Sequence, residues 1–161
     1  MEVESELCRA SLFSLLPPPP ESEEAPSTHY LTQRRFAQVK SLHPRLTAQL
    51  AKLGYDRMTR VQLSAYVPIS RGEDVLIKSL TGSGKTLAYL VPLFNRLMKA
   101  SPALTRTSGT RLLVLAPTRE LCAQIAEVLG QLGSAAIGLV AGVLTGGEAL
   151  KSEKERLRKG L

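Results

Sequence analysis

The 161-residue sequence contains no tryptophan, and aromatic residues make up only 4% of it. Its two cysteines, Cys8 and Cys122, have no metal-ligand spacing, and we expect no disulfide between them, which suits a reducing compartment. No apolar run reaches the roughly 20 residues that a membrane-spanning helix needs. The first residues are acidic and the apolar stretch "SLFSLL" is short, so no secretory signal is expected. These absences argue against a disulfide scaffold and against a membrane protein.

Charge is distributed unevenly along the chain. The net charge is +7, but residues 1–30 carry six acidic residues and one basic residue, whereas residues 31–161 carry 20 basic and 8 acidic residues. The proline- and glutamate-rich stretch 17–27 predicts a disordered leader over residues 1–30, although "PPPP" could also be a polyproline ligand. The basic remainder, 31–161, is predicted to be one folded domain. Its charge is compatible with a polyanionic partner such as nucleic acid, and equally with a basic domain that has none.

The hydrophobic periodicity predicts helices that alternate with buried strands. Helices are expected from Leu42 to Gly54, around 61–69 with an interruption near Pro68, over 84–100 with a bend at Pro92, over 118–133 with Thr118 as N-cap, and in the charged tail 148–161. Strands are expected at 74–80, 111–117 and within 137–147. This alternation indicates parallel β-α units, in which ligands bind at the carboxyl ends of the strands.

The stretch "SLTGSGKT" (79–86) lies between a predicted strand and a predicted helix. It matches the phosphate-binding pattern G-x-x-x-x-G-K-[ST] except that Ser79 occupies the first position. Gly82 and Gly84 allow the backbone N–H groups to approach phosphate oxygens, and the helix N-terminus adds its dipole. Lys85 can then reach the β- and γ-phosphates, and the hydroxyl of Thr86 can bind Mg²⁺.

Three further motifs accompany this loop. "GYDRMTRVQ" (54–62) ends in Gln62, whose donor and acceptor suit the N6/N7 edge of adenine, and Phe36 lies 18 positions before its glycine and could stack on the base. "APTREL" (116–121) places Arg119 at a helix start, where it can contact a nucleic-acid phosphate. "TGGE" (145–148) supplies a glycine pair that would admit an RNA backbone. Each has a simpler interpretation, respectively an exposed glutamine, a capped helix with a surface ion pair, and a plain turn.

Together these motifs resemble those of the DEAD-box ATP-dependent RNA helicases, whose phosphate loop begins with alanine. The resemblance runs from about Phe36 to Leu161 and implies an α/β fold of the P-loop NTPase (RecA-like) class, a three-layer α/β/α parallel sheet that is incomplete here. It implies ATP and Mg²⁺ as cofactors and RNA as a partner contacted through its backbone. The implied nucleotide-binding residues are Phe36, Tyr55, Thr59, Gln62, Thr81, Gly82, Ser83, Gly84, Lys85 and Thr86, with Thr86 also the Mg²⁺ ligand; the implied RNA-binding residues are Pro117, Thr118, Arg119, Gly146 and Gly147.

The resemblance also predicts what these 161 residues do alone. They contain no D-E-A-D or S-A-T motif and no second lobe, so we expect a monomer with negligible ATPase activity, an unpaired strand edge and exposed core residues. The stretch 142–160 looks most like the ribosome-assembly branch, which implies the nucleus or nucleolus, with the cytoplasm as alternative. A non-catalytic ATP- or RNA-binding module is the second hypothesis. A small P-loop kinase is a distant third, because it does not explain "PTREL" or the Gln62 motif.

Overall fold

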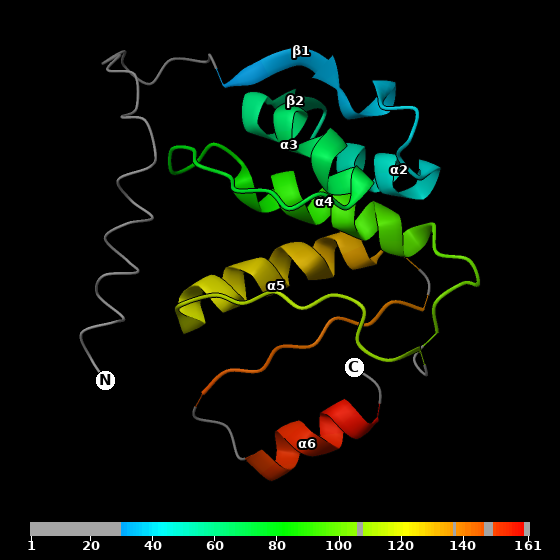
Figure 1. The fold of residues 1–161 in the computed structure, drawn as a ribbon, viewed down its shortest axis with the longest axis vertical. Coiled ribbons are helices and arrows are strands. Elements are labelled where there is room, and N and C mark those ends of the chain that lie inside the picture. The colour runs from blue at the N-terminus through cyan, green and yellow to red at the C-terminus, as the bar shows by residue number, and fades with distance from the viewer. Residues whose placement is uncertain (1–29, 106–107, 137, 147–149, 160–161) are drawn as a thin grey trace.

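The computed structural model of the chain describes residues 30–105, 108–136, 138–146 and 150–159 (Figure 1). The leader predicted over residues 1–30 falls outside these ranges except for Tyr30, and so does Gly147. Within them the elements follow in the order β1 (Leu31–Arg35), the 3-10 helix η1 (Phe36–Gln38), α2 (Pro44–Lys52), β2 (Arg57–Thr59), α3 (Arg60–Arg71), α4 (Lys85–Met98), α5 (Arg119–Gly133) and α6 (Leu150–Arg158).

The helices begin where capping chemistry allows them to begin. His43 caps α2 because its Nδ1 accepts a hydrogen bond from the Arg45 amide at 3.2 Å, and Pro44 takes the first helical position, where no N–H is needed. Thr118 caps α5, since its hydroxyl oxygen accepts from the Leu121 amide at 3.2 Å. The prediction of Thr118 as N-cap and of a helix that ends at Gly133 is therefore confirmed.

Two prolines lie inside helices. Pro68 lies in α3 and Pro92 in α4. The predicted interruption near Pro68 is wrong, because α3 continues to Arg71 and ends at Gly72, a left-handed residue with φ of 84°. A proline removes one backbone donor from a helix, and the packing of α3 on α4 compensates for that loss.

The core gathers around α4. Leu90 and Val91 of α4 are fully buried, and so are Leu46 and Leu50 of α2. Leu132 near the end of α5 joins them in one cluster. Figure 1 shows the resulting order, in which β1 and β2 lie at one end, α4 lies between α3 and α5, and α6 lies at the far end. The apolar stripes that predicted these helices are the faces that meet here.

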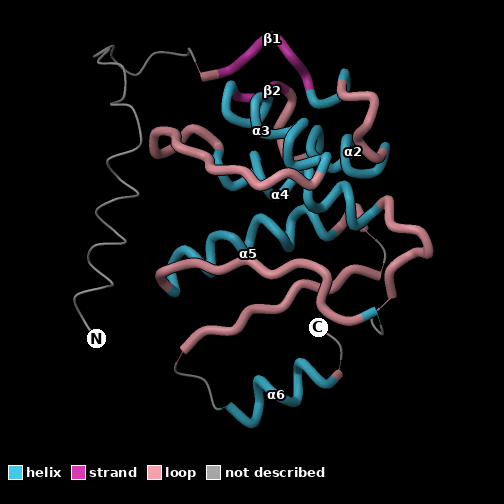
Figure 2. The backbone as a smooth tube through the Cα atoms, in the orientation of Figure 1, coloured by secondary structure: helices cyan, strands magenta, loops and turns pink. Residues whose placement is uncertain are grey.

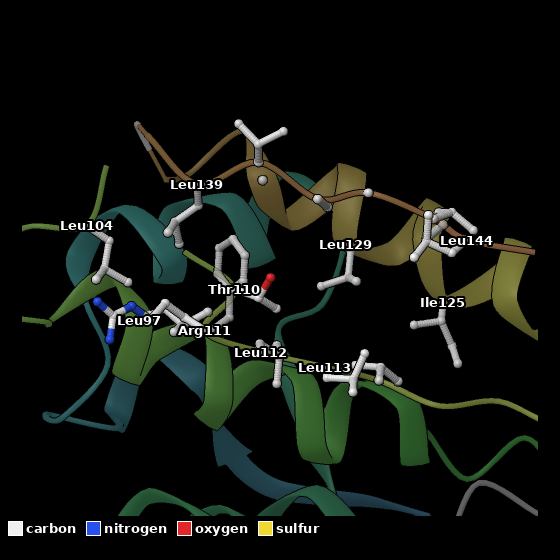
Figure 3. Close-up of a pocket in the computed structure, with 18 of the residues that line it drawn as sticks. Leu97, Leu104, Thr110, Arg111, Leu112, Leu113, Ile125, Leu129, Leu139 and Leu144 are labelled. Carbon is white, nitrogen blue, oxygen red and sulfur yellow. The ribbon is translucent and has the colours of Figure 1, made fainter. Parts of the chain in front are cut away.

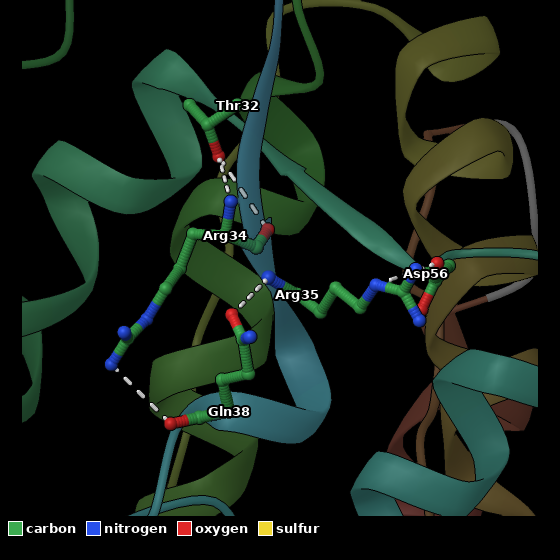
Figure 4. Close-up of polar contacts among 5 residues, drawn as sticks. All are labelled: Thr32, Arg34, Arg35, Gln38 and Asp56. Atoms are coloured by element: carbon green, nitrogen blue, oxygen red, sulfur yellow. Dashed lines mark hydrogen bonds and ion pairs between the residues drawn. The ribbon is translucent and has the colours of Figure 1, made fainter.

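The strands β1 and β2 pair as a short antiparallel ribbon near the start of the described residues. Leu31 pairs with Thr59 and Arg35 with Arg57, and the Thr32 hydroxyl donates to the Met58 carbonyl at 2.8 Å. The turn into η1 is fixed by the Gln38 side-chain oxygen, which accepts from the Arg35 amide at 3.1 Å, as Figure 4 shows. This ribbon was not predicted, because "LTQRR" has no alternation of apolar and polar residues.

The strands predicted at 74–80, 111–117 and 137–147 do not form. In the described residues these three stretches are drawn-out loops, shown in Figure 2, and β1 pairs only with β2. Residues 111–117 still alternate between exposed and half-buried side chains, and Leu113 and Leu115 are 73% and 84% exposed. Alternation marks a segment that can pair, but a ladder also needs a neighbouring strand at hydrogen-bonding distance.

No helix in the described ranges combines the length and the apolar character that crossing a membrane requires.

Candidate nucleotide-binding site

Residues 79–84 form a loop that leads directly into α4. Gly82 and Gly84 have φ angles of 75° and 87°, a left-handed conformation that glycine adopts without strain. Gly84 is the N-cap of α4 and gives it no side-chain capping bond. The first amides of α4 therefore have no side-chain acceptor at the cap, and a helix N-terminus in this condition attracts anions.

Gln62 connects this loop to the start of α3. Its side-chain oxygen accepts from the Thr59 amide at 2.9 Å, and its side-chain nitrogen donates to the Gly84 carbonyl at 3.2 Å. A second bond joins the same two residues, because the Thr59 hydroxyl oxygen accepts from the backbone N–H of Gln62 at 3.4 Å. Gln62 is only 5% exposed, and a Cβ atom on Gly84 would lie 2.6 Å from its side-chain nitrogen. The geometry thus requires glycine at position 84 and ties the Gln62 motif to the phosphate loop.

Lys85 is turned onto the loop itself. Its ammonium group donates to the carbonyl oxygens of Ser79, at 2.7 Å, and of Leu80. The residues of the loop fit a phosphate group, because it combines glycines at positive φ, an uncapped helix N-terminus and one lysine. Thr86 follows in the first turn of α4 with a single hydroxyl to offer a cation. Among the described residues, no group of three or more histidine, cysteine or acidic side chains could hold a metal ion.

The aromatic residues predicted to face the base, Phe36 and Tyr55, lie in or against the main core cluster. Phe36 is 2% exposed and belongs to the main core cluster, so its ring would have to be uncovered before a base could stack on it. Tyr55 is half-buried and packs against the same cluster. Its backbone N–H donates to the Leu50 carbonyl at 2.8 Å. The role of Phe36 and Tyr55 in base binding stays a prediction.

The predicted RNA-contacting residues come together from two distant parts of the sequence. A Cβ atom on Gly146 would lie 3.5 Å from a terminal nitrogen of Arg119, so these two residues meet in space. Pro117, Thr118 and Arg119 are exposed at the start of α5. The Thr118 hydroxyl already caps the helix, and Arg119 is the basic group at this point, next to the exposed Glu120.

A separate cavity of about 360 Å³ is lined by α5 and by Phe94 and Leu97 of α4. Its wall combines the segments 109–116 and 138–144 with Ile125 and Leu129 of α5, as Figure 3 shows. The lining is predominantly apolar and contains no residue from 79 to 86. This cavity is therefore not where the phosphate loop would hold its ligand.

One polar network on the helix that begins at Lys85 was not predicted from the sequence. The Asn95 side chain, buried in α4, accepts from the His43 amide at 2.7 Å and donates to the Ser41 carbonyl at 2.9 Å. Ser41 and Tyr66 join their hydroxyl groups at 2.9 Å, and Lys99 also donates to the Ser41 carbonyl. The network fixes the segment after η1 on the helix that carries Lys85. An asparagine in the apolar run "LVPLFNRL" was the available signal, because a buried amide needs partners.

The comparisons with known proteins agree with this geometry. A family model described as DEAD/DEAH box helicase matches residues 59–161. This chain belongs to the DEAD/DEAH box helicase family. Among relatives, it is 46% identical over 121 residues to the DEAD-box ATP-dependent RNA helicase 17 of Oryza sativa subsp. japonica, a match over 74% of this chain and 20% of that protein. It is 40% identical to the ATP-dependent RNA helicase dbp7 of Aspergillus oryzae, in a match that covers 94% of this chain and 23% of that protein.

Two solved structures share the fold of this helicase-family chain. The RNA helicase Prp28 from Chaetomium thermophilum, crystallised with ADP, aligns with a TM-score of 0.64 and 32% identity over 76% of this chain and 30% of that chain. A DEAD box protein from Methanococcus jannaschii aligns with a TM-score of 0.64 and 22% identity over 80% of this chain and 32% of that chain. The predicted α/β, RecA-like fold class is confirmed, although the parallel strands expected from the sequence are unpaired here. The chain spans about a fifth of the length of the two relatives named above.

Proposed function

We propose that this helicase-family chain carries the ATP-binding elements and part of the RNA-binding surface of an ATP-dependent RNA helicase. The observation that supports this most directly is the hydrogen bond from the Gln62 side chain to the Gly84 carbonyl. It joins two residues that are 22 positions apart in separate sequence motifs, which supports a single nucleotide site built from both motifs. A capped helix that happened to follow a glycine-rich turn would not need this second motif.

We assign the roles in the site as follows. The loop residues Thr81 to Gly84 would surround the phosphates, Lys85 would contact the β- and γ-phosphates, and Thr86 would bind Mg²⁺. Gln62 would contact adenine with the amide hydrogen and oxygen lone pair that its bonds to Gly84 and Thr59 leave unused, once nucleotide binding uncovers the side chain. Phe36 and Tyr55 would lie beside the base. Bound ATP with Mg²⁺ would supply the phosphoryl group whose transfer drives a helicase. The residues of this chain would bind and orient the nucleotide.

The proposed activity of the 161-residue polypeptide by itself is binding without turnover. Phosphoryl transfer requires charges placed around the γ-phosphate and a group that orients the attacking water. Lys85 and Thr86 supply only part of that arrangement, and the sequence contains no D-E-A-D motif. Calorimetry with MgATP, combined with an assay of phosphate release in the presence of RNA, tests the proposal. We expect saturable binding and no release, and RNA-stimulated release would refute the second expectation.

The finer biological assignments rest on resemblance. We propose a role in ribosome assembly and a nuclear or nucleolar location, with the cytoplasm as the alternative, from the stretch 142–160. We also propose that the chain is a monomer and that it contacts RNA through phosphates and sugars, independently of base sequence. Charge supports the RNA proposal, since residues 31–161 carry 20 basic and 8 acidic residues.

Replacing Gln62 with alanine is expected to relax the preference for ATP over GTP. The substitution removes both the amide that would read adenine and the bond that holds Gly84. Gln49→Ala is a matched control, because the Gln49 side chain also donates to a backbone carbonyl, that of Gln131 at 2.8 Å, but lies far from the loop in α2. Competition titrations would measure both nucleotides. Equal binding of ATP and GTP by the unmodified chain would contradict the role of Gln62.

Arg119→Ala is expected to weaken RNA binding about equally for unrelated single strands. Loss of one phosphate contact should also reduce the slope of log affinity against log salt by about 1. Fluorescence anisotropy at several salt concentrations would show both effects. Arg45→Ala is the control, since it removes the same charge from an exposed position in α2.

The basic residues of α6 can bind RNA by charge alone, so they need a separate variant. Changing Lys151 and Lys154 of α6, together with Lys159 directly after it, to glutamine keeps the chain length and removes three positive charges. If these changes abolish binding while Arg119→Ala leaves it intact, RNA does not use the surface around Arg119 and Gly146.

A further inference from the structure

Ser79 makes a contact that the alanine of the family's usual loop cannot make. Its hydroxyl donates a hydrogen bond to the hydroxyl oxygen of Ser83 at 2.8 Å. Ser83 is 3% exposed, so its oxygen is shielded from water. The contact joins the first residue of the loop to the residue before Gly84, and therefore closes the turn with a side-chain bond in addition to the backbone bond between Ser83 and Leu80.

The groups that a phosphate would need are engaged within this closed loop. The Ser83 amide donates to the Leu80 carbonyl at 3.4 Å. The Lys85 ammonium donates to the carbonyls of Ser79 and Leu80. A bound phosphate would compete with these carbonyls for the same two donors. Nucleotide binding must therefore exchange internal hydrogen bonds for bonds to the ligand.

We propose that the Ser79 hydroxyl is a positioning group that holds the phosphate loop closed and thereby lowers the apparent affinity for nucleotide. The inference rests on the proposed nucleotide-binding function of the same loop. Ligand binds only the open loop, so the apparent dissociation constant is the intrinsic one divided by the open fraction. Any contact present only in the closed loop reduces that fraction.

Removing the hydroxyl shifts this balance in one direction. In Ser79→Ala the closed loop loses a hydrogen bond, and the buried Ser83 oxygen loses its donor. An unsatisfied buried oxygen raises the free energy of the closed loop further, whereas in the open loop the Ser83 hydroxyl can contact water or ligand. Opening therefore becomes easier. A single hydrogen bond of ordinary net strength corresponds to a change of about fivefold in the open fraction.

The test is the binding of a fluorescent ADP with Mg²⁺ to the 161-residue chain, by equilibrium titration and stopped flow. Ser79→Ala is expected to bind about fivefold more tightly. The double variant Ser79→Ala/Ser83→Ala should show no greater loop opening than Ser79→Ala alone, because both lack the same single bond. Ser64→Ala, at an exposed position in α3, is the matched control and should bind like the unmodified chain. Unchanged or weaker binding by a folded Ser79→Ala would overturn the proposal.

Hydrogen exchange of the ligand-free chain separates this proposal from the proposed function. Amides in the loop 80–84 should exchange about fivefold faster in Ser79→Ala than in Ser64→Ala, with no change in the exchange of α5. If no variant binds nucleotide but loop exchange is accelerated, the nucleotide function fails and the closing role of Ser79 stands. If nucleotide binds and loop exchange is unchanged, the closing role fails alone. Should Ser79→Ala not fold, loop exchange in ligand-free Ser83→Ala tests the closing bond, because that variant lacks the same bond.

Discussion

Replacing Lys85 with alanine is expected to weaken the binding of Mg²⁺-bound adenine nucleotide to the helicase-family chain by roughly ten- to a hundredfold. In the closed loop the Lys85 ammonium is bonded only to the neutral carbonyls of Ser79 and Leu80. The proposed ligand offers charged phosphate oxygens instead, and hydrogen bonds between two charged groups are the stronger kind. Isothermal titration calorimetry would measure the loss directly.

Two further variants show whether charge or shape at position 85 is responsible. Lys85→Arg keeps the positive charge but replaces a compact ammonium with a planar group, so we expect it to restore binding only in part. Lys52→Ala removes a positive charge from an exposed position at the end of α2 and should leave affinity within about twofold at physiological salt, where distant charges are screened. Unchanged affinity of Lys85→Ala would refute the assignment of Lys85 to the phosphates.

Leu90→Ala is expected to lower the free energy of unfolding by about 2–5 kcal/mol. Leu90 is fully buried in α4, within the cluster that also contains Leu46 and Leu132. Truncation would leave a cavity at the junction of several helices, and such a site collapses poorly. Because domains are stable by only about 5–15 kcal/mol, much of the chain's stability would be lost. Urea denaturation followed by circular dichroism would give the difference.

An exposed leucine provides the comparison for this variant. Leu63 in α3 is 41% exposed, and Leu63→Ala should cost well under 1 kcal/mol, since substitutions at the surface usually lie within about 0.5 kcal/mol. If both variants shifted the urea midpoint equally, the packing around α4 would not be the main source of stability.

The sequence correctly predicted the elements that are stabilised by residues within one short continuous stretch. The helix after Thr118 has its cap, its apolar stripe and its terminal glycine in one continuous stretch, and it forms as predicted. The phosphate loop was likewise identified from eight consecutive residues, and the structure places them between a drawn-out segment and α4. The family and the fold class followed from motifs of this kind.

Elements that depend on a distant partner were predicted poorly. A strand pattern such as "RLLVLAP" indicates which side chains can face a core, but pairing depends on where a second strand lies. The β1–β2 ribbon shows the reverse case, since its polar residues carry no pattern and its register is set by contacts such as Thr32 with Met58. Gln62 illustrates the same limit within the site. Its motif was recognised, but its bond to Gly84 could not be read from spacing alone.

The unpaired segment 111–117 has a consequence for the integrity of the chain. None of its backbone groups is bonded to another described backbone group, whereas those of α4 and α5 are enclosed in helices. Proteases act on backbone that is exposed and free of hydrogen bonds. The exposed side chains of Leu113 and Leu115 could also bind in the specificity pocket of such an enzyme. A cut here would separate Arg119 and Gly146 from the phosphate loop. The two proposed binding surfaces are thus joined by a stretch of backbone that a protease can attack.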